Sequence, residues 1–133
     1  MAPEYAVVSE RATILVVEDE VLIRLLIADE LRDAGFVVIE AACADEAVSL
    51  FATGMRVDLV FTDVRMPGDL TGLDLARELS VQQPSLPVII TSGNVTAQDA
   101  HGLGLFVSKP YELSRVVCLI EERLGLSVPG SDG

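Results

Sequence analysis

The sequence predicts a doubly wound α/β fold in which helices cover both faces of a five-stranded parallel sheet. Short runs of β-branched apolar residues alternate along the chain with longer segments of helical apolar spacing. Strands that are apolar along their whole length are typical of parallel sheets buried on both faces. The 133 residues, half of them hydrophobic, suffice for one compact domain. We expect that domain over residues 12–125, between an N-terminal extension (1–11) and a flexible tail (126–133).

The first strand and helix follow from an apolar run and an apolar stripe. Residues 13–17 are the first expected strand, because residues 14–17 form an uninterrupted apolar run, which is typical of a buried strand. Residues 21–34 form a helix that ends at Gly35, because glycine readily adopts the left-handed conformation found after helices. The stripe of this helix that we expect to face the core contains Leu22, Leu25, Leu26, Ile27 and Leu31.

The middle of the chain repeats this alternation twice. Residues 36–40 are the expected second strand, and the helix over 44–53 begins with acidic residues that suit its positive amino end. Residues 59–62 are the third strand and 72–83 the third helix, after which two prolines bracket a turn.

The last third of the chain contains the shortest predicted helix. Residues 88–91 are the fourth strand, 105–107 the fifth, and 113–124 an amphipathic final helix. Only sixteen residues (93–108) must supply a loop, a helix and the fifth strand. The fourth helix is therefore predicted to be shortened, with about two turns over 94–101.

The chain is strongly acidic, which limits its partners. Nine lysine and arginine residues face 21 aspartate and glutamate residues, a formal net charge of -12. This charge opposes nucleic-acid and anionic-lipid binding, so we expect no nucleic-acid and no membrane partner. The absence of a cationic leader and of a long apolar stretch predicts a cytoplasmic protein.

The cysteines and the histidine suggest no disulfide framework and no zinc site. Cys43 and Cys118 are too few for a disulfide framework. Because His101 is the single histidine of the sequence, a histidine cluster for zinc is excluded, and we expect His101 at the surface.

Polar residues follow the apolar cores of four predicted strands. They are Glu18 and Asp19 after the first strand, Asp63 after the third, Ser92 after the fourth and Lys109 after the fifth. In open parallel sheets, binding sites gather at the carboxyl ends of the strands. The sequence therefore predicts one site at this edge, with Asp63 at its centre.

The carboxylates of this set predict a site for a divalent cation. Glu18, Asp19 and Asp63 in one crevice would repel each other unless a cation or a shared proton relieves the repulsion. Mg²⁺ prefers hard oxygen ligands and keeps water, so we expect Asp19 and Asp63 to bind it directly and Glu18 through water. The backbone carbonyl of Arg65 would complete the protein ligands. The alternative is an acidic helix start, since acidic residues also favour helix amino ends.

Asp63 is the predicted acceptor of a phosphoryl group. A carboxylate can form an aspartyl phosphate where positive charge and hydrogen-bond donors meet the phosphoryl oxygens. Lys109 would contact one oxygen, Mg²⁺ a second and the Ser92 hydroxyl a third. Pro110 favours an extended or turn conformation at Lys109, which would direct its side chain into the crevice. Thr91 is the alternative hydroxyl, although alternation along the strand points it to the other side.

Four motifs, in this order, resemble the response-regulator receiver domain of two-component signalling. They are residues 14–20 (ILVVEDE), 61–67 (FTDVRMP), 87–92 (PVIITS) and 107–110 (VSKP). The resemblance covers roughly residues 12–124. It implies a flavodoxin-like (βα)5 fold with strand order 2-1-3-4-5.

The resemblance also implies roles for the residues at the strand ends. Asp63 would be phosphorylated by a phosphohistidine donor, while Glu18 and Asp19 hold Mg²⁺. Ser92 would be the switch hydroxyl and Phe106 the switch aromatic residue. A phosphoryl group would draw Ser92 inward and vacate space for Phe106 to rotate, so that phosphorylation alters a distant face. The implied partners are a histidine kinase or histidine phosphotransfer protein upstream and an unidentified protein downstream.

Three features depart from the family pattern. The segment before Lys109 is several residues shorter, the turn over residues 67–72 is one residue longer, and Phe106 replaces the commoner tyrosine. Arg65 could also reach Glu18 or the phosphoryl group and hinder an attacking water, which predicts slow dephosphorylation.

We expect a stand-alone receiver domain that assists its own phosphorylation and dephosphorylation but is otherwise not an enzyme, and that signals through protein contact. Two rival classes share some of these features. A phosphohydrolase with an aspartate nucleophile normally needs a second acid two residues later, where this chain has Arg65. A receiver fold that acts as an interaction module without phosphorylation stays an alternative, because an intact pocket does not prove its use in signalling.

Overall fold

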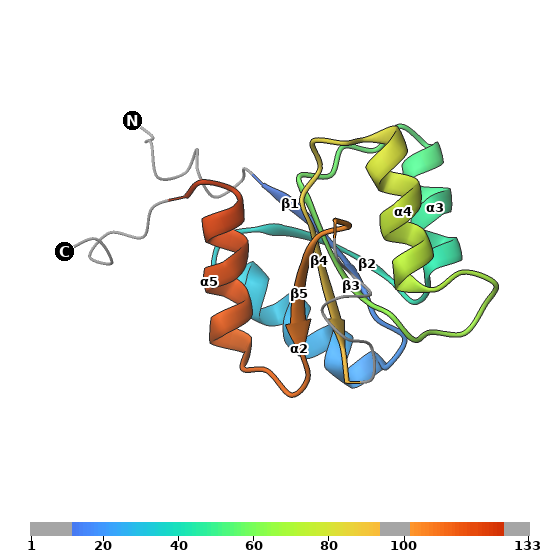
Figure 1. Cartoon of the computed structure of the whole chain (residues 1–133). Coiled ribbons are helices and arrows are strands. Elements are labelled where there is room, and N and C mark those ends of the chain that lie inside the picture. The colour runs from blue at the N-terminus through green and yellow to red at the C-terminus, as the bar shows by residue number, and fades with distance from the viewer. Residues whose placement is uncertain (1–11, 94–101, 127–133) are drawn as a thin grey trace.

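The computed structural model of the chain describes residues 12–93 and 102–126, which contain a five-stranded parallel sheet (Figure 1). The strands are β1 (Thr13–Val17), β2 (Val37–Ala41), β3 (Leu59–Asp63), β4 (Val88–Ser92) and β5 (Leu105–Ser108). Their order across the sheet is β2-β1-β3-β4-β5, and each neighbouring pair is parallel. The order 2-1-3-4-5 that the resemblance implies is therefore confirmed.

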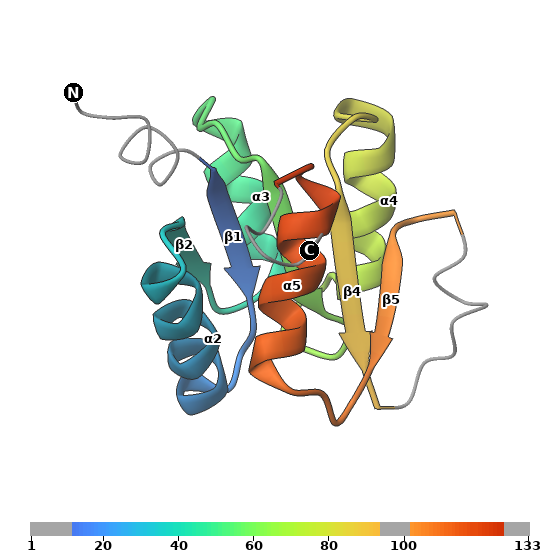
Figure 2. The same ribbon diagram turned by 90° about the vertical axis from the view of Figure 1, so that its left-hand side faces the viewer.

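Helices cover both faces of this sheet. They are α2 (Val21–Asp33), α3 (Ala44–Ala52), α4 (Gly72–Gln82) and α5 (Leu113–Arg123). α2 and α5 lie on one face, and α3 and α4 lie together on the other (Figures 1 and 2). Such two-sided cover satisfies strands that are apolar along their length. The predicted doubly wound α/β fold is confirmed.

Eight of the nine described elements end one residue away from the predicted position, and only the second strand also starts at a different residue. The second strand begins at Val37 rather than Phe36, because Val37 is the residue that pairs with Thr13 at the start of β1. β3 and β4 each include the polar residue that follows their apolar run, Asp63 and Ser92 respectively. The predicted short helix over residues 94–101 lies outside the described part of the chain.

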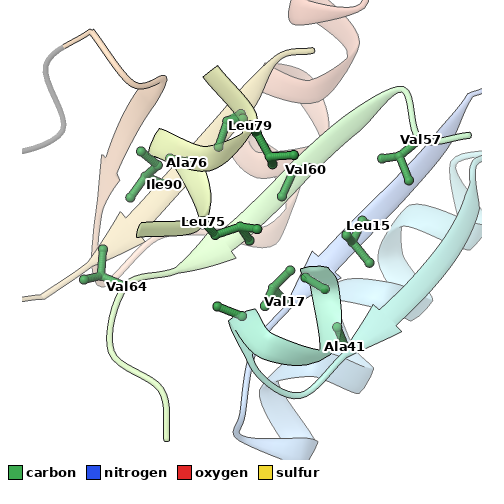
Figure 3. Packing of buried hydrophobic residues seen from close by; sticks show 13 residues of the cluster. Leu15, Val17, Ala41, Val57, Val60, Val64, Leu75, Ala76, Leu79 and Ile90 are labelled. Atoms are coloured by element: carbon green, nitrogen blue, oxygen red, sulfur yellow. The ribbon is translucent and has the colours of Figure 1, made fainter. Parts of the chain in front are cut away.

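Side chains alternate between the two faces of the sheet and form two cores. From β1, Leu15 and Val17 pack toward α3 and α4, whereas Ile14 and Val16 pack toward α2 and α5. Figure 3 shows the first of these cores, in which Val60 and Ile90 join Leu15 and Val17 beneath α4. Full burial of one such side chain contributes about 1.5–3 kcal/mol. The two cores thus fix the sheet between its two layers of helices.

The predicted core stripe of α2 is partly wrong. Ile27 and Leu31 are buried as expected, but Leu22, Leu25 and Leu26 are 76%, 41% and 58% exposed. Nine residues separate Leu22 from Leu31, which is about two and a half helical turns and places them on opposite sides of the helix. The apolar residues of α2 therefore form two stripes, and only the one centred on Ile27 and Leu31 faces the sheet.

None of the described helices could span a membrane. The longest of them, α2, has 13 residues, whereas a transmembrane helix needs about 20.

Candidate functional site

The polar residues predicted from the sequence meet at one edge of the sheet. All five strands run in the same direction, so their carboxyl ends lie along this edge (Figure 2). Glu18 and Asp19 follow β1, and Asp63 ends β3 at the next position across the sheet. Ser92 ends β4, and Lys109 follows β5. The strand order thus brings together residues that are up to 91 positions apart in the chain.

Three carboxylates form an acidic cluster at the centre of this edge. One oxygen from each of Glu18, Asp19 and Asp63 lies within 4.8 Å of the other two. Glu18 and Asp63 are buried, with 2% and 7% of their surface exposed, and Asp19 is partly exposed. Hard carboxylate oxygens at this spacing are the ligands that Mg²⁺ prefers, and the partly open side leaves room for the waters that it keeps. The donor set therefore fits Mg²⁺.

Lys109 provides a positive charge within this cluster. Its Nζ donates a hydrogen bond to Asp63 Oδ2 at 3.0 Å and lies 3.9 Å from Glu18 Oε1. Burial alone would lower the pKa of Lys109, but the hydrogen bond and the negative charges of Asp63 and Glu18 raise it above its usual value. Lys109 is therefore an ammonium at neutral pH, aimed at the carboxylate of Asp63.

Asp63 is held in one orientation by donors at both of its oxygens. The backbone N–H of Val64 donates to Oδ1 at 2.8 Å, while Lys109 occupies Oδ2. Gly72, the first residue of α4, donates its N–H to the Val64 carbonyl at 2.9 Å. A Cβ at Gly72 would lie 1.9 Å from the Asp63 carbonyl oxygen, so only glycine permits this approach of α4 to the strand end.

Burial of Glu18 makes its charge costly. Desolvation, opposed by a hydrogen bond from the Glu20 N–H and assisted by the charge of Asp63, raises the pKa of Glu18 to about 7. The ammonium of Lys109 can neutralise only one of the two buried carboxylates, Glu18 and Asp63, so the site keeps an excess of negative charge. A divalent cation would relieve this excess, which agrees with the donor set.

The two hydroxyl residues of β4 lie in different surroundings. Thr91 pairs with Asp63 across the sheet, and Ser92 lies one residue further toward the edge. Both are buried, and the Ser92 carbonyl accepts a hydrogen bond from the Lys109 N–H at 3.1 Å. The Thr91 hydroxyl makes no hydrogen bond of good geometry with the described residues, although its proximity to the Tyr111 hydroxyl partly opposes the rise in the pKa of Tyr111. The choice of Ser92 as the switch hydroxyl stays a prediction.

Phe106 lies on β5 opposite Ile90, where it is partly buried against the core beneath α3 and α4. Its place at the rim of that core suits the switch aromatic residue, and this role of Phe106 stays a prediction. Arg65 is exposed, two residues after Asp63 on the loop toward α4. The use of its carbonyl as a metal ligand, and of its side chain to slow dephosphorylation, stay predictions.

Two residues that border the site, Tyr111 and Arg24, have no role in the prediction from sequence. The Tyr111 ring packs edge-on against Phe61, with centroids 5.9 Å apart, and burial together with the charges of Glu18 and Asp63 raises its pKa to about 12. Arg24 donates to the Glu18 carbonyl at 2.8 Å. One signal was available for Arg24: it is the only charged residue within an otherwise apolar run at the start of α2.

Comparisons with known proteins show which family this chain resembles. A family model described as the response regulator receiver domain matches residues 14–121. The sensor kinase CckA of Brucella abortus is 36% identical over 124 residues, which are 87% of this chain and 13% of that protein. The transcriptional regulatory protein PdtaR of Mycobacterium tuberculosis is 35% identical over 114 residues, 81% of this chain and 54% of that protein. The chain thus spans about half or less of these curated relatives.

Solved structures show the same fold. The receiver domain of NtrX from Brucella abortus superposes with a TM-score of 0.74 at 37% identity, covering 86% of this chain and 99% of that one. A response regulator receiver protein from Sinorhizobium medicae gives a TM-score of 0.80 at 26% identity, covering 86% of this chain and 94% of that one. Because the family match covers most of the chain and includes every strand-end residue described above, the chain belongs to the response regulator receiver domain family.

Proposed function

We propose that this chain is a Mg²⁺-dependent phosphoacceptor of a phosphorelay, in which Asp63 accepts a phosphoryl group from a phosphohistidine donor. The main support is the position of the Lys109 ammonium, 3.0 Å from Asp63 Oδ2 and beside two further carboxylates. A buried aspartate with a fixed positive charge at one oxygen and an acidic cluster beside it suits nucleophilic attack on phosphorus better than a structural role.

The transfer step moves one phosphoryl group without net oxidation or reduction. A carboxylate oxygen of Asp63 attacks the phosphorus, the P–N bond to the donor histidine breaks, and the released imidazole nitrogen takes the electron pair. The Val64 N–H fixes the plane of the attacking carboxylate through Oδ1. Lys109 then stabilises the charge on a phosphoryl oxygen, and the Ser92 hydroxyl donates to another.

We propose that Mg²⁺ is held by Glu18, Asp19, Asp63 and the backbone carbonyl of Arg65. When bound, the ion would neutralise charge on the transferring phosphoryl group. Glu18 and Asp19 contribute by presenting their oxygens from the end of β1, within 4.8 Å of an Asp63 oxygen.

Phosphorylation would signal through a change in protein contacts. The phosphoryl group would draw in Ser92, and Phe106 would follow into the vacated space at the rim of the core. The proposed upstream partner is a histidine kinase or a histidine phosphotransfer protein, and the downstream partner is another protein. We propose that this domain assists its own phosphorylation and dephosphorylation and catalyses no other reaction. A cytoplasmic location stays a prediction.

The second candidate is a receiver fold that binds its partner without phosphorylation. The Lys109–Asp63 hydrogen bond is compatible with this function as well, because a lysine that neutralises a buried aspartate can serve structure alone. The two functions differ in what happens to Asp63, so one experiment separates them.

The test is the intact mass of the protein after incubation with acetyl phosphate, with Mg²⁺ or with EDTA. We expect a single phosphoryl increment that requires Mg²⁺ and is lost in Asp63→Asn. Asp69→Asn is the matched control, because it removes an exposed carboxylate from the same loop and should keep the increment. An increment that persists in Asp63→Asn, or none from either acetyl phosphate or a phosphorylated histidine phosphotransfer protein, would overturn the proposed function.

A further inference from the structure

Arg24 forms a hydrogen bond with the backbone of Glu18, one of the three residues of the acidic cluster. Its Nη1 donates to the Glu18 carbonyl oxygen at 2.8 Å, and its Nε donates to Glu40 Oε1 at 3.1 Å. The side chain is 16% exposed, so the guanidinium is largely enclosed between α2 and the ends of β1 and β2. An arginine can make two such contacts at once because its donors are fixed in one plane.

These contacts complete the fixation of Glu18. Its N–H donates to the Ala41 carbonyl at 3.0 Å, which continues the pairing of β1 with β2 by one residue beyond Val17. Its side chain accepts from the Glu20 N–H at 3.0 Å. Arg24 holds the remaining polar group, the carbonyl that begins the peptide leading to Asp19. The direction of this peptide determines where the Asp19 carboxylate lies relative to Glu18 and Asp63.

Arg24 is itself held in place by its ion pair with Glu40. Glu40, near the end of β2, accepts from Arg24 at one oxygen and from Arg32 at the other, at 3.2 Å. Arg32 also donates to the Val38 carbonyl at 3.1 Å. The guanidinium of Arg24 therefore joins the ends of two strands to one helix, and its ion-pair partner Glu40 lies outside the acidic cluster.

We infer that Arg24 is a positioning residue that orients the Glu18–Asp19 peptide so that both carboxylates face Asp63 in the geometry that Mg²⁺ needs. Mg²⁺ demands nearly ideal octahedral geometry, so a peptide free to rotate would present its carboxylates less often in a competent arrangement. Groups that orient metal ligands commonly change metal affinity about 10- to 100-fold when they are removed. The inference rests on the proposed function, since it assumes that the cluster binds Mg²⁺.

The experiment measures Mg²⁺ binding to the unphosphorylated protein by isothermal titration calorimetry. In Arg24→Met, which keeps the aliphatic stem and removes the donors, we expect Mg²⁺ affinity to fall about tenfold or more. Arg32→Met is the matched control: it removes the other arginine on Glu40 but no contact with Glu18, and it should bind Mg²⁺ as the wild type does. Arg24→Lys, which retains one donor, should recover part of the affinity.

Kinetics with acetyl phosphate separate positioning from a loss of fold. In Arg24→Met the Mg²⁺ concentration for half-maximal phosphorylation should rise, while the rate at saturating Mg²⁺ stays near that of the wild type. Thermal unfolding in EDTA shows whether each variant is folded, and Arg24→Lys serves as the test if Arg24→Met is not. Equal Mg²⁺ affinity in the wild type and the Arg24 variants, or an equal loss in Arg32→Met, would overturn the inference and leave the proposed function intact. A wild type that binds no Mg²⁺ would overturn both.

Discussion

Lys109 shows how one residue can define the chemistry of this site. It is the only lysine in the chain; the other eight basic residues are arginines. A compact ammonium fits between Asp63 and Glu18 and contacts both, at 3.0 and 3.9 Å, whereas a planar guanidinium would need more room and a paired acceptor. The same ammonium could follow the negative charge from the free carboxylate to the phosphoryl group.

Replacing Lys109 tests this role directly. We expect Lys109→Met to slow phosphorylation by acetyl phosphate about 100-fold, because removal of one preorganised donor typically costs that much. Lys109→Arg keeps the charge but not the shape and should give an intermediate rate. Intact mass followed over time measures both. If Lys109→Met is phosphorylated as fast as the wild type, the ammonium has only a structural role.

At the scale of elements, the start of α4 connects stability to the site. α4 begins with a capping box in which the Thr71 side chain accepts from the Asp74 N–H at 3.1 Å and the Asp74 carboxylate accepts from the Thr71 N–H at 2.9 Å. Gly72 then lies directly against the strand end that contains Asp63. The cap thus anchors the helix whose first residue supports the acceptor loop.

The charge of Asp74 makes this cap dependent on pH. The hydrogen bond from the Thr71 N–H and, to a smaller extent, the positive charge of Arg77 lower the pKa of Asp74 below its usual value of 3.8. A carboxylate with a lowered pKa stabilises the fold above the unfolded-state pKa, and this stabilisation is lost as the pH falls through the folded-state pKa.

We therefore expect Asp74→Asn to lower the free energy of unfolding by about 0.5 kcal/mol at pH 7. The difference from the wild type should shrink as the pH falls below 3.8. Urea unfolding at several pH values measures it. Glu78→Gln, one turn later in the same helix, is the control and should show a smaller effect. A difference between the wild type and Asp74→Asn that does not change with pH would contradict the assignment to the Asp74 charge.

At the scale of the whole molecule, an exposed apolar surface lies beside the site. Leu22 and Leu26 are 76% and 58% exposed on α2, and Leu26 lines a shallow groove that also includes Lys109 and Tyr111. A protein that delivers a phosphoryl group to Asp63 must reach past Lys109 and would cover this groove. The apolar residues that the core does not use are therefore expected to contact the phosphodonor.

A negative charge placed on this surface should slow phosphorylation by a protein donor but not by a small-molecule donor. We expect Leu26→Glu to slow phosphotransfer from a phosphorylated histidine phosphotransfer protein or kinase about tenfold, as loss of a well-packed interface residue does. Phosphorylation by acetyl phosphate should not change, because the pocket itself is intact. Val81→Glu is the control, since Val81 is 81% exposed on α4. Equal slowing with both donors would point to damage within the site instead.

The sequence by itself determined the fold class, the strand order implied by the family motifs, and the set of residues at the strand ends. Apolar runs followed by polar residues can be recognised in the sequence alone. Because parallel strands all end at the same edge of the sheet, these polar residues can be predicted to lie together. Asp63, Glu18 and Asp19 could be placed together on that ground alone. The same local pattern could not show which apolar residues of α2 face the core, because spacing defines faces of a helix but not which face meets the sheet.

Only the tertiary structure decided the contacts between these residues. Two of these contacts join segments that are distant in sequence: the hydrogen bond from Lys109 to Asp63 and the packing of Tyr111 on Phe61. A third, the hydrogen bond from Arg24 to the Glu18 carbonyl, depends on which side of α2 Arg24 occupies. Such contacts depend on how far each strand extends and how each helix is rotated about its axis. Both are set by packing against the rest of the molecule, which no local pattern of residues encodes.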